Sequence, residues 1–184
     1  MSEISPDAGG GISLEALISR AERAGAGAPL VDTWHPAHCG TIDMRIEADG
    51  RWVHAGSPIE REPLVRLFSS ILRREADGSF VLVTPAEKLS IEVEDAPFVA
   101  VEMSAEGGVL RFRTNVGDLV TVDDDHPLRL ARGGGDAFMP YVRVRGGLEA
   151  RLTRSLAFDL AGRIEERNGK AGIASGASWF PVDA

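Results

Sequence analysis

Two segments of this chain, which start 30 residues apart, repeat one spacing of residues, and this repeat constrains the fold more than any other feature. The shared pattern is T-x4-L-x5-D-x-P followed by an apolar residue, and it runs from Thr84 to Phe98 and again from Thr114 to Leu128. Self-similarity at a fixed spacing is typical of a duplicated supersecondary unit. Two strands joined by a turn can also produce such a pattern twice by chance. We therefore expect a duplication and leave a chance origin open.

Apolar and polar residues alternate over much of the chain, as they do in half-buried strands. The first predicted strand pair spans residues 39–53 and turns at Asp49-Gly50, where both residues tolerate a positive φ. Further strands are expected at residues 80–84, 89–93, 99–103, 109–114, 119–122 and 141–145.

Three stretches have the apolar periodicity of an amphipathic helix. The first follows Ser13, which can cap it, between residues 1–12, which we expect to be disordered, and a glycine-rich linker at residues 25–29. The second starts near Glu62, because Pro63 suits the first turn of a helix. The third is expected from about Leu148 to Ile164, where leucines recur every four residues.

These elements predict an α+β fold made of two similar antiparallel strand sets, each followed by a helix and packed into one unit. Residues 1–33 are expected to form an N-terminal tail with a short amphipathic helix. Residues 34–104 form the first half, and residues 105–184 form the second half with a C-terminal helix and tail.

Composition excludes several classes of protein. The chain has 184 residues, a net charge of −8 and one cysteine. Net acidity argues against a nucleic-acid binder, which needs a clustered basic face. The chain has neither a secretory signal nor an apolar run long enough for a membrane span, so we expect it in the cytoplasm and away from membranes. A single cysteine excludes an intramolecular disulfide and a zinc site of several thiolates.

Basic side chains are concentrated near the end of the chain. Residues 75–125 hold 12 acidic and 3 basic side chains, a net of −9, whereas residues 143–154 hold 4 arginines and 1 glutamate, a net of +3. Arg143 and Arg145 are expected on one face of a strand, and Arg151 on the helix after it. These guanidinium groups can bind the phosphate or carboxylate of a small anionic ligand. Alternatively they pair with the acidic segment, at Asp95 or at residues 123–125.

Two predicted turns carry further polar candidates for ligand binding. Thr84 and Lys88 lie in one strand connection, and Thr114 and Asn115 lie in the repeated one. Turn chemistry explains the threonines and the asparagine equally well. His126, between an aspartate and a proline, can titrate near neutral pH or simply cap a turn.

Cys39 allows three interpretations. It lies near His35 and His38, so a mixed metal site or a redox-sensitive thiol is chemically conceivable, and a nucleophilic role would need a base such as His54 beside it. We expect instead a small buried side chain at the start of a strand, with no bound metal or cofactor. None of the common hydrolase, zinc-protease, phosphate-loop or dinucleotide-binding motifs is present, so the sequence leans away from an enzyme.

The body of the chain, about residues 34–182, resembles the bacterial domain-of-unknown-function 1285 family. The resemblance is carried by Cys39-Gly40-x-Ile42-Asp43-Met44-Arg45-Ile46, Gly56-Ser57-Pro58-Ile59, Leu64-Val65, Val83-Thr84-Pro85-x-Glu87-Lys88, Glu94-Asp95-Ala96-Pro97-Phe98, Thr114-Asn115-x-Gly117-Asp118, His126-Pro127-Leu128, Val144-Arg145-x-Gly147-Leu148-Glu149-Ala150 and the tail Gly172-Ile173-x-Ser175-Gly176-x-x-x-Phe180-Pro181. Trp179 stands where the family pattern suggests phenylalanine.

The resemblance implies a duplicated α+β fold whose second half is similar to a pleckstrin-homology-like barrel closed by a helix. It also implies a nucleotide-like small molecule bound between the halves, in signalling or stress response, although the family has no established activity. Together these points predict a non-enzymatic module for a small anionic ligand. A protein-interaction adaptor is the alternative, followed by a redox or metal-dependent enzyme centred on Cys39.

Overall fold

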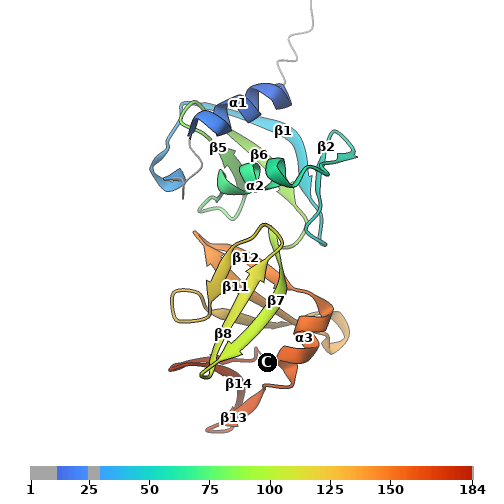
Figure 1. The fold of residues 1–184 in the computed structure, drawn as a ribbon, viewed down its shortest axis with the longest axis vertical. Helices are drawn as coiled ribbons and strands as arrows, with labels where there is room; N and C mark the ends of the chain where they lie inside the picture. The colour runs from blue at the N-terminus through green and yellow to red at the C-terminus, as the bar shows by residue number, and fades with distance from the viewer. Residues whose placement is uncertain (1–11, 25–29, 184) are drawn as a thin grey trace, which may run out of the picture.

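The computed structural model describes residues 12–24 and 30–183. Figure 1 shows two lobes stacked along the long axis of the molecule. The disorder expected for residues 1–12 and the linker expected at residues 25–29 fall outside the described residues, apart from Ile12.

The first lobe is built on a six-stranded sheet, which we call sheet A. Its strand order is β3-β2-β1-β6-β5-β4, and its central strands β1 and β6 are parallel while all other neighbours are antiparallel. The strands are β1 (His38–Ile46), β2 (Trp52–His54), β3 (Ser57–Pro58), β4 (Leu72–Arg74), β5 (Phe80–Val83) and β6 (Glu87–Val93).

The second lobe contains sheet B, which also has six strands and curves into a half-barrel. Its order is β10-β11-β12-β7-β8-β9, again with one parallel pair, β7 and β12, at the centre. The strands are β7 (Phe98–Glu106), β8 (Val109–Thr114), β9 (Leu119–Thr121), β10 (Leu128–Arg132), β11 (Phe138–Arg145) and β12 (Leu148–Leu152), with a short 3-10 helix at Gly134–Asp136. Residues 98–104, expected in the first half, therefore lie in sheet B.

The two sheets share one topology, so the predicted duplication is confirmed. In each sheet the first three strands along the chain form one half and the next three form the other half, and we call these halves wings. The first and the sixth strand in chain order are neighbours at the centre of the sheet and run parallel. The expectation of purely antiparallel strand sets is wrong, because the strand that starts the first wing and the strand that ends the second wing run in the same direction where the two wings meet.

The sequence repeat does not mark the structural repeat. Equivalent strands start 60 residues apart, at His38 in β1 and Phe98 in β7, whereas the sequence pattern recurs after 30. The pattern aligns hairpin β5–β6 with hairpin β8–β9, which occupy different places in their sheets. Both hairpins place a buried threonine at the turn, whose hydroxyl accepts backbone N–H groups, so shared turn chemistry explains the resemblance.

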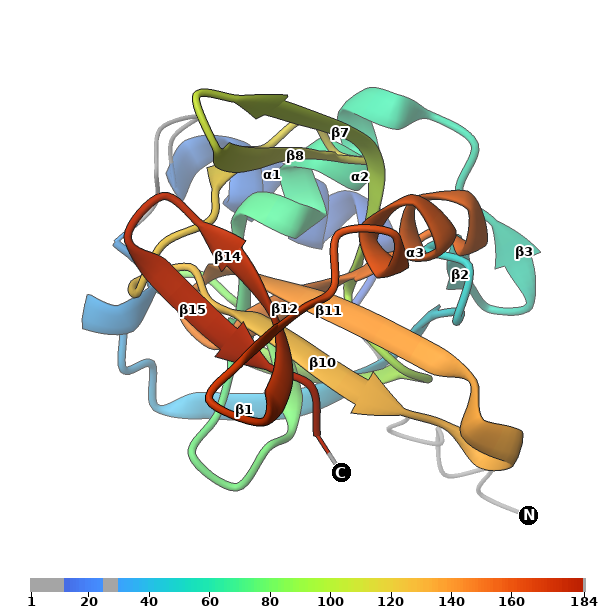
Figure 2. The ribbon, with the colours of Figure 1, turned by 90° about the horizontal axis from the view of Figure 1, so that it is seen from below.

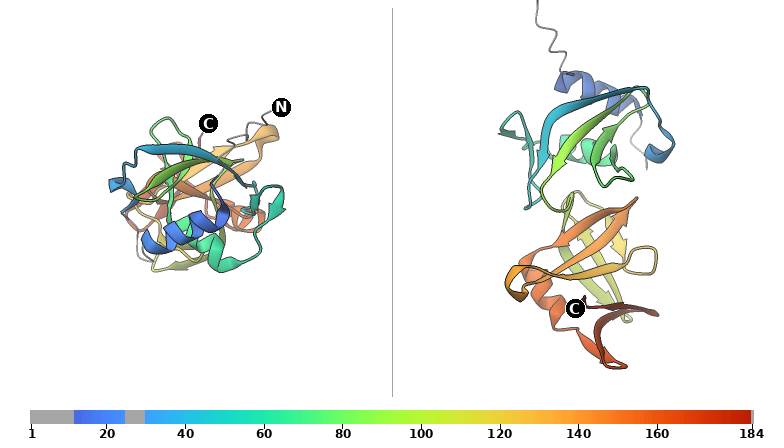
Figure 3. Two further views of the ribbon diagram at one scale, coloured as in Figure 1. Left: turned by 90° about the horizontal axis from the view of Figure 1, so that it is seen from above. Right: turned by 180° about the vertical axis from the view of Figure 1, so that it is seen from behind.

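Two helices cover one face of sheet A, as the left view in Figure 3 shows. Helix α1 (Leu14–Ala24) begins after Ser13, whose hydroxyl accepts the N–H of Ala16 at 3.2 Å, and it buries Leu17 completely. Helix α2 (Glu62–Ser70) has Pro63 in its first turn, as predicted, and buries Phe68. In chain order α2 lies between β3 and β4, so the helix interrupts the first strand set and, contrary to expectation, does not follow it.

The predicted helix from Leu148 to Ile164 is wrong in its first part. Residues 148–152 form β12, in which Leu148, Ala150 and Leu152 are buried on alternate positions. A leucine spacing of four fits a strand as well as a helix, since four is a multiple of two. Helix α3 (Arg154–Ala161) starts only after Thr153, whose hydroxyl accepts the N–H of Leu156.

A small third sheet closes the chain at the end of the molecule far from α1, where Figure 2 shows β14 and β15 in front. It contains β13 (Glu165–Arg167), β14 (Lys170–Ser175) and β15 (Ser178–Pro181). Val182 bridges to Leu130 beside the edge strand β10, and Ser175 joins β14 to the other wing of sheet B. This C-terminal sheet therefore spans the open side of the half-barrel.

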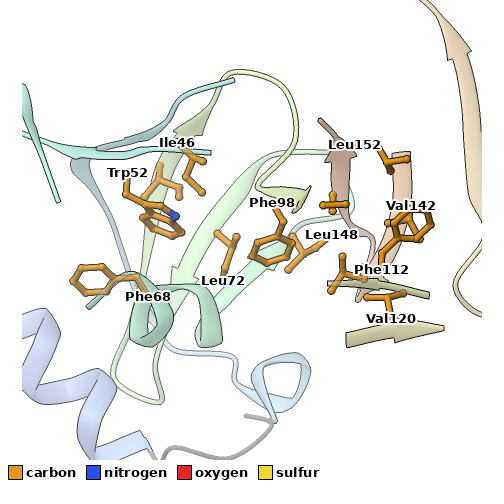
Figure 4. Close-up of a cluster of buried hydrophobic side chains, with 14 of the residues drawn as sticks. Ile46, Trp52, Phe68, Leu72, Phe98, Phe112, Val120, Val142, Leu148 and Leu152 are labelled. Atoms are coloured by element: carbon orange, nitrogen blue, oxygen red, sulfur yellow. The ribbon is translucent and has the colours of Figure 1, made fainter. Parts of the chain in front are cut away.

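One hydrophobic core runs through both lobes. In Figure 4, the side chains of Ile46, Trp52 and Phe68 form the first-lobe part, and those of Phe112 and Val142 lie in the second. Leu72, Phe98 and Leu148 lie between these two groups and are essentially buried. The joint between the lobes is therefore packed, and it supports side chains at its rim.

Candidate functional site

A cavity of about 390 Å³ lies at the joint between the two lobes, and we call it the joint cavity. The first lobe contributes the end of α2, the start of β4 and the short 3-10 helix Val31–Thr33. The second lobe contributes the β8–β9 turn and the β11–β12 turn. Its lining consists of Val31, Asp32, Arg66, Ser69, Ser70, Leu72, Arg73, Val116, Asp118, Arg145, Gly146 and Leu148.

Arg145, at the end of β11, connects the two sides of the joint cavity. Its Nη1 donates to Asp118 Oδ2 at 2.8 Å within the second lobe, and its Nη2 donates to the carbonyl oxygen of Ser69 at 2.7 Å in the first lobe. Its guanidinium carbon lies 5.0 Å from the centre of the Phe98 ring, in cation–π range. The aromatic ring and the two acceptors therefore hold the guanidinium in one place.

The other two arginines of the joint cavity differ in how many of their N–H donors already have partners. Arg73 is almost buried, binds the Glu75 carboxylate at 2.7 Å, and donates through Nη1 to the carbonyl oxygens of Val31 and Trp34. It thus fastens the segment around the 3-10 helix to sheet A. Among the described residues, Arg66 pairs with Glu62, at 3.6 Å, and 63% of its side chain is exposed, so it can turn toward a ligand.

The balance of charge in the joint cavity is slightly positive. Three guanidinium groups face the carboxylates of Asp32 and Asp118. The carbonyl oxygens at the C-terminal end of α2 add partial negative charge on one side. The cavity also has apolar walls, from Val31, Leu72, Val116 and Leu148. It therefore suits a ligand with an apolar body and one acidic group.

Of the eight residues predicted to bind ligand, the joint cavity contains Arg145. Thr114 and Asn115 lie next to it in the β8–β9 turn: the Thr114 hydroxyl accepts the N–H of Asp118, and Asn115 Oδ1 accepts the N–H of Val99. These contacts shape the turn that presents Val116 and Asp118 to the cavity. Thr84 is fully buried and organises the β5–β6 turn in the same way.

The remaining predicted residues lie elsewhere on the surface. Arg151, which the structure places on β12 and not on a helix, pairs with Asp95 at 3.1 Å. Arg143 is exposed on β11, and Lys88 lies on β6 with its Nζ 3.6 Å from Glu75. The alternative that arginines pair with the acidic middle of the chain is thus confirmed for Asp95.

His126 lies in a turn that the Asp123 side chain caps, so the turn interpretation of His126 holds with Asp123, and not His126, as the capping residue. Asp123 Oδ1 accepts the backbone N–H of His126 at 2.8 Å and lies 3.0 Å from its Nδ1. These backbone and side-chain hydrogen bonds from His126 hold the pKa of the Asp123 carboxyl below its usual value.

Outside the joint cavity, Tyr141 lies at the centre of a network of polar and charged side chains. Its hydroxyl donates to Asp95 at 2.8 Å, and the guanidinium of Arg129 lies 4.0 Å from its ring centre. Burial, and then the hydrogen bond to Asp95, raise the pKa of the Tyr141 hydroxyl. Arg129 also binds Glu149 through two nitrogens, and this hydrogen bonding raises the pKa of its guanidinium. This network secures the segment between the sheets to the outer face of sheet B.

The expectation that Cys39 is a buried side chain is wrong, because the structure shows it exposed. Cys39 lies on the same face of β1 as the exposed Thr41 and Asp43, opposite the face on which Ile42, Met44 and Ile46 are buried. Cys39 pairs with Lys88 on β6, whereas His54 pairs with Met44, five residues further along β1. At about 3.3 Å per residue this places His54 roughly 16 Å from the thiol, too far for the expected base. Within residues 12–24 and 30–183, no three metal-binding side chains come together.

Sequence reasoning missed Asp32, Arg66 and Arg73. None of them stands in a motif, and a surface arginine on a helix has the same local pattern as one that lines a cavity. The sequence pattern predicts a turn at Asp118. The contact between Asp118 and Arg145 depends on how β7, β8 and β12 pair, which no local pattern predicts. Among the described helices, none is long and apolar enough to cross a membrane.

The fold and the cavity define a two-lobed α+β protein in which duplicated mixed sheets meet at an arginine-lined joint. The chain belongs to the family described as domain of unknown function 1285. The N-terminal domain of that family matches residues 29–96, and its C-terminal domain matches residues 97–182. The boundary between the two falls just before β7, where sheet B begins.

Two solved structures of the same family are similar to this chain. A DUF1285 family protein from Silicibacter pomeroyi is 43% identical over 90% of this chain and 93% of its own, with a TM-score of 0.84. A DUF1285 family protein from Shewanella baltica is 25% identical over 66% of this chain and 91% of its own, with a TM-score of 0.53. Among curated proteins, none matches the chain.

Proposed function

We propose that this protein is a non-enzymatic module that binds a small anionic ligand, of the nucleotide type or a similar phosphate- or carboxylate-bearing class, in the joint cavity. The observation that carries the proposal is the guanidinium of Arg145, held at the junction of the two lobes inside a cavity of about 390 Å³. Cavities of that size suit small organic ligands. A role in signalling or stress response, and a similarity of the second lobe to a pleckstrin-homology-like barrel, belong to the same proposal through the family resemblance.

Ligand binding would use the donors of Arg145 that its two present partners leave free. One N–H of each terminal nitrogen and the Nε–H remain after the bonds to Asp118 and Ser69 are counted. Arg66 supplies a second cation from the rim of the cavity. The apolar walls formed by Leu72, Val116 and Leu148 would cover the non-polar part of the ligand.

Asp118 limits how tightly an anion binds, because its carboxylate already occupies Arg145. A ligand acid would have to approach beside this carboxylate, and like charges at close range repel. Replacing Asp118 with asparagine removes that repulsion while leaving an oxygen that can still accept from Arg145. This substitution should therefore strengthen binding, in contrast with loss of the arginine.

Equilibrium titration of the full chain with a panel of nucleotides and inorganic phosphate tests the proposal. The Arg145→Ala variant should bind at least tenfold more weakly, and Asp118→Asn should bind more tightly. Arg143→Ala is the matched control, because Arg143 lies two residues away on β11, is exposed, and does not line the cavity. The proposal is overturned if no panel member saturates the protein, or if Arg143→Ala and Arg145→Ala bind alike while both remain folded.

A protein-interaction adaptor remains the second candidate, because two large apolar side chains lie on the surface of the second lobe. Phe158 on α3 is 80% exposed and Leu119 on β9 is 71% exposed. A photo-crosslinking residue at position 159, exposed on α3 beside Phe158, should then capture a partner in cells, and the Phe158→Ser change should abolish that capture. Capture that persists unchanged in the variant would count against an adaptor surface at this helix.

A further inference from the structure

A second hollow adjoins the joint cavity on the side of the first lobe, and we call it the side pocket. Its volume is about 300 Å³. It is lined by Asp32, His35, Pro36, Arg73, Arg74, Glu75, Ala76 and Lys88. Asp32 and Arg73 also line the joint cavity, so the two hollows are neighbours that share a wall.

The side pocket differs from the joint cavity in chemistry. Leu72, Val116 and Leu148 line the joint cavity, whereas none of the described residues that line the side pocket has a large apolar side chain. Three permanent cations and His35 instead face two carboxylates, those of Asp32 and Glu75. The side pocket therefore offers an excess of positive charge with almost no apolar surface, as an anion-binding region requires.

The residue that lines both hollows is not one of the residues with free N–H donors in the side pocket. Arg73, which lines both hollows, is bound to Glu75 and to the carbonyl oxygens of Val31 and Trp34, so its donors are already occupied. Among the described residues, Lys88 has one loose pair, with Glu75 at 3.6 Å. Arg74 donates one long hydrogen bond, 3.4 Å, to the carbonyl oxygen of Gly147, and its guanidinium lies 5.7 Å from the centre of the Phe80 ring, so most of its N–H donors are free. The ammonium and guanidinium of these two residues are the groups that an incoming anion can engage.

We infer that the side pocket is an anionic subsite and that the ligand is an elongated molecule. Its apolar body lies in the joint cavity, and its phosphate or carboxylate group lies where the two hollows meet, so that Arg145 engages it from the joint cavity and Lys88 and Arg74 engage it from the side pocket. This inference rests on the proposed function, because the body of the ligand occupies the cavity of Arg145. It also gives a role to Lys88, one of only two lysines in the chain.

The two lysines allow a direct test within one molecule. Lys88 is 29% exposed in the side pocket, and Lys170 lies exposed on β14, far from the joint. Phenyl phosphate, which combines an apolar ring with a phosphate, should slow acetylation of Lys88 several-fold and leave Lys170 unchanged, as measured by mass spectrometry. Phenyl phosphate should also bind about tenfold more tightly than inorganic phosphate, because only its ring fills the joint cavity.

Calorimetric titration of variants separates the subsite from the joint cavity. Lys88→Met should bind phenyl phosphate about tenfold more weakly, and the matched Lys170→Met should bind it as the unchanged protein does. If Arg145→Ala loses binding but Lys88→Met does not, and Lys88 is not protected, the joint cavity stands and the subsite is overturned. If Lys88 is protected but Arg145→Ala binds normally, the side pocket acts alone, and both the elongated ligand and the proposed function are wrong. If phenyl phosphate does not bind at millimolar concentration, the inference fails, and the nucleotide panel still decides the proposed function.

Discussion

Arg145 donates a hydrogen bond of 2.7 Å to the carbonyl oxygen of Ser69, a residue 76 positions earlier in the chain and in the other lobe. The same guanidinium binds Asp118 and lies over the ring of Phe98, which is fully buried at the joint. One side chain thus joins the end of α2, a turn of sheet B and the core between the lobes. Its removal has consequences for stability as well as for binding.

Arg145→Ala should lower the free energy of unfolding by about 1–2 kcal/mol. Hydrogen bonds to charged groups contribute about 1.5–3 kcal/mol, and the 36% exposure of this side chain reduces that value through solvent screening. Urea unfolding followed by tryptophan fluorescence measures the change. Arg143→Ala, on the same strand and exposed, should change the free energy by less than about 0.5 kcal/mol. Equal effects of the two substitutions would mean that Arg145 does not connect the lobes.

The pKa of Tyr141 can be measured directly, because it is the only tyrosine in the chain. Burial and the hydrogen bond to Asp95 raise this pKa above its ordinary value of about 10. Absorbance of the phenolate during alkaline titration should show the elevated value, and Asp95→Asn should lower it. Since the folded-state pKa is raised, the resulting stabilisation is complete below about pH 10 and is lost as the pH rises through the folded-state value. A pKa at or below 10 in the native protein would contradict this network.

Ser175 fastens the C-terminal sheet to sheet B. Its hydroxyl donates to the carbonyl oxygen of Val122 at 2.8 Å and accepts the N–H of Leu110 at 3.0 Å, and the residue is 2% exposed. Ser175→Ala leaves two buried backbone groups without this partner and should cost about 2–3 kcal/mol of stability. Ser104→Ala, at an exposed position of β7, should be close to neutral. Thermal unfolding of both variants tests this, and a neutral Ser175→Ala would show that the C-terminal sheet is held by its apolar contacts alone.

Helix α1 supplies the only cation that pairs with Glu87 among the described residues. Arg20 of α1 pairs with this carboxylate, which is 1% exposed on β6. Arg20→Met should destabilise the protein by about 2 kcal/mol, because it leaves a buried charge without a partner and Arg20 itself is partly exposed. Arg23→Met on the same helix is the control, and adding Glu87→Gln to Arg20→Met should recover part of the loss. No recovery would show that the ion pair does not account for the cost.

Cys39 should react with Ellman's reagent in the native protein, with one thiol per chain and at nearly the rate of the unfolded protein. The structure predicts this because the side chain is exposed at the start of β1. Cys39→Ser should abolish the signal without changing stability. A native thiol that reacts only after denaturant is added would restore the interpretation of a buried residue.

Local patterns in the sequence predicted most elements of this fold. Pro63 and the apolar spacing after it located α2, and Thr84 and Thr114 marked two hairpin turns that the structure contains. The strand patterns located most strands of both sheets but not β3, β4 or β10, and they assigned β12 to a helix. Each of these depends on hydrogen bonds and side-chain faces within a few residues, which the order of amino acids determines directly. The duplication was also predicted, but from a 30-residue repeat that reflects shared turn chemistry, whereas equivalent strands of the two sheets start 60 residues apart.

Only the tertiary structure decided the conformation of residues 148–152, the exposure of Cys39 and the residues that line the cavities. Leu148 and Leu152 fit a helix or a strand equally well, and only pairing with β7 and β11 makes them a strand. Cys39 is exposed because its face of β1 is left uncovered while the opposite face is buried, and Arg73 lines two hollows because the first lobe folds its early segment back on β4. Contacts between residues far apart in the chain create these environments, and no local pattern records which distant groups will meet. The sequence thus determined the elements and the charges, and packing of the two lobes decided which charges face a ligand.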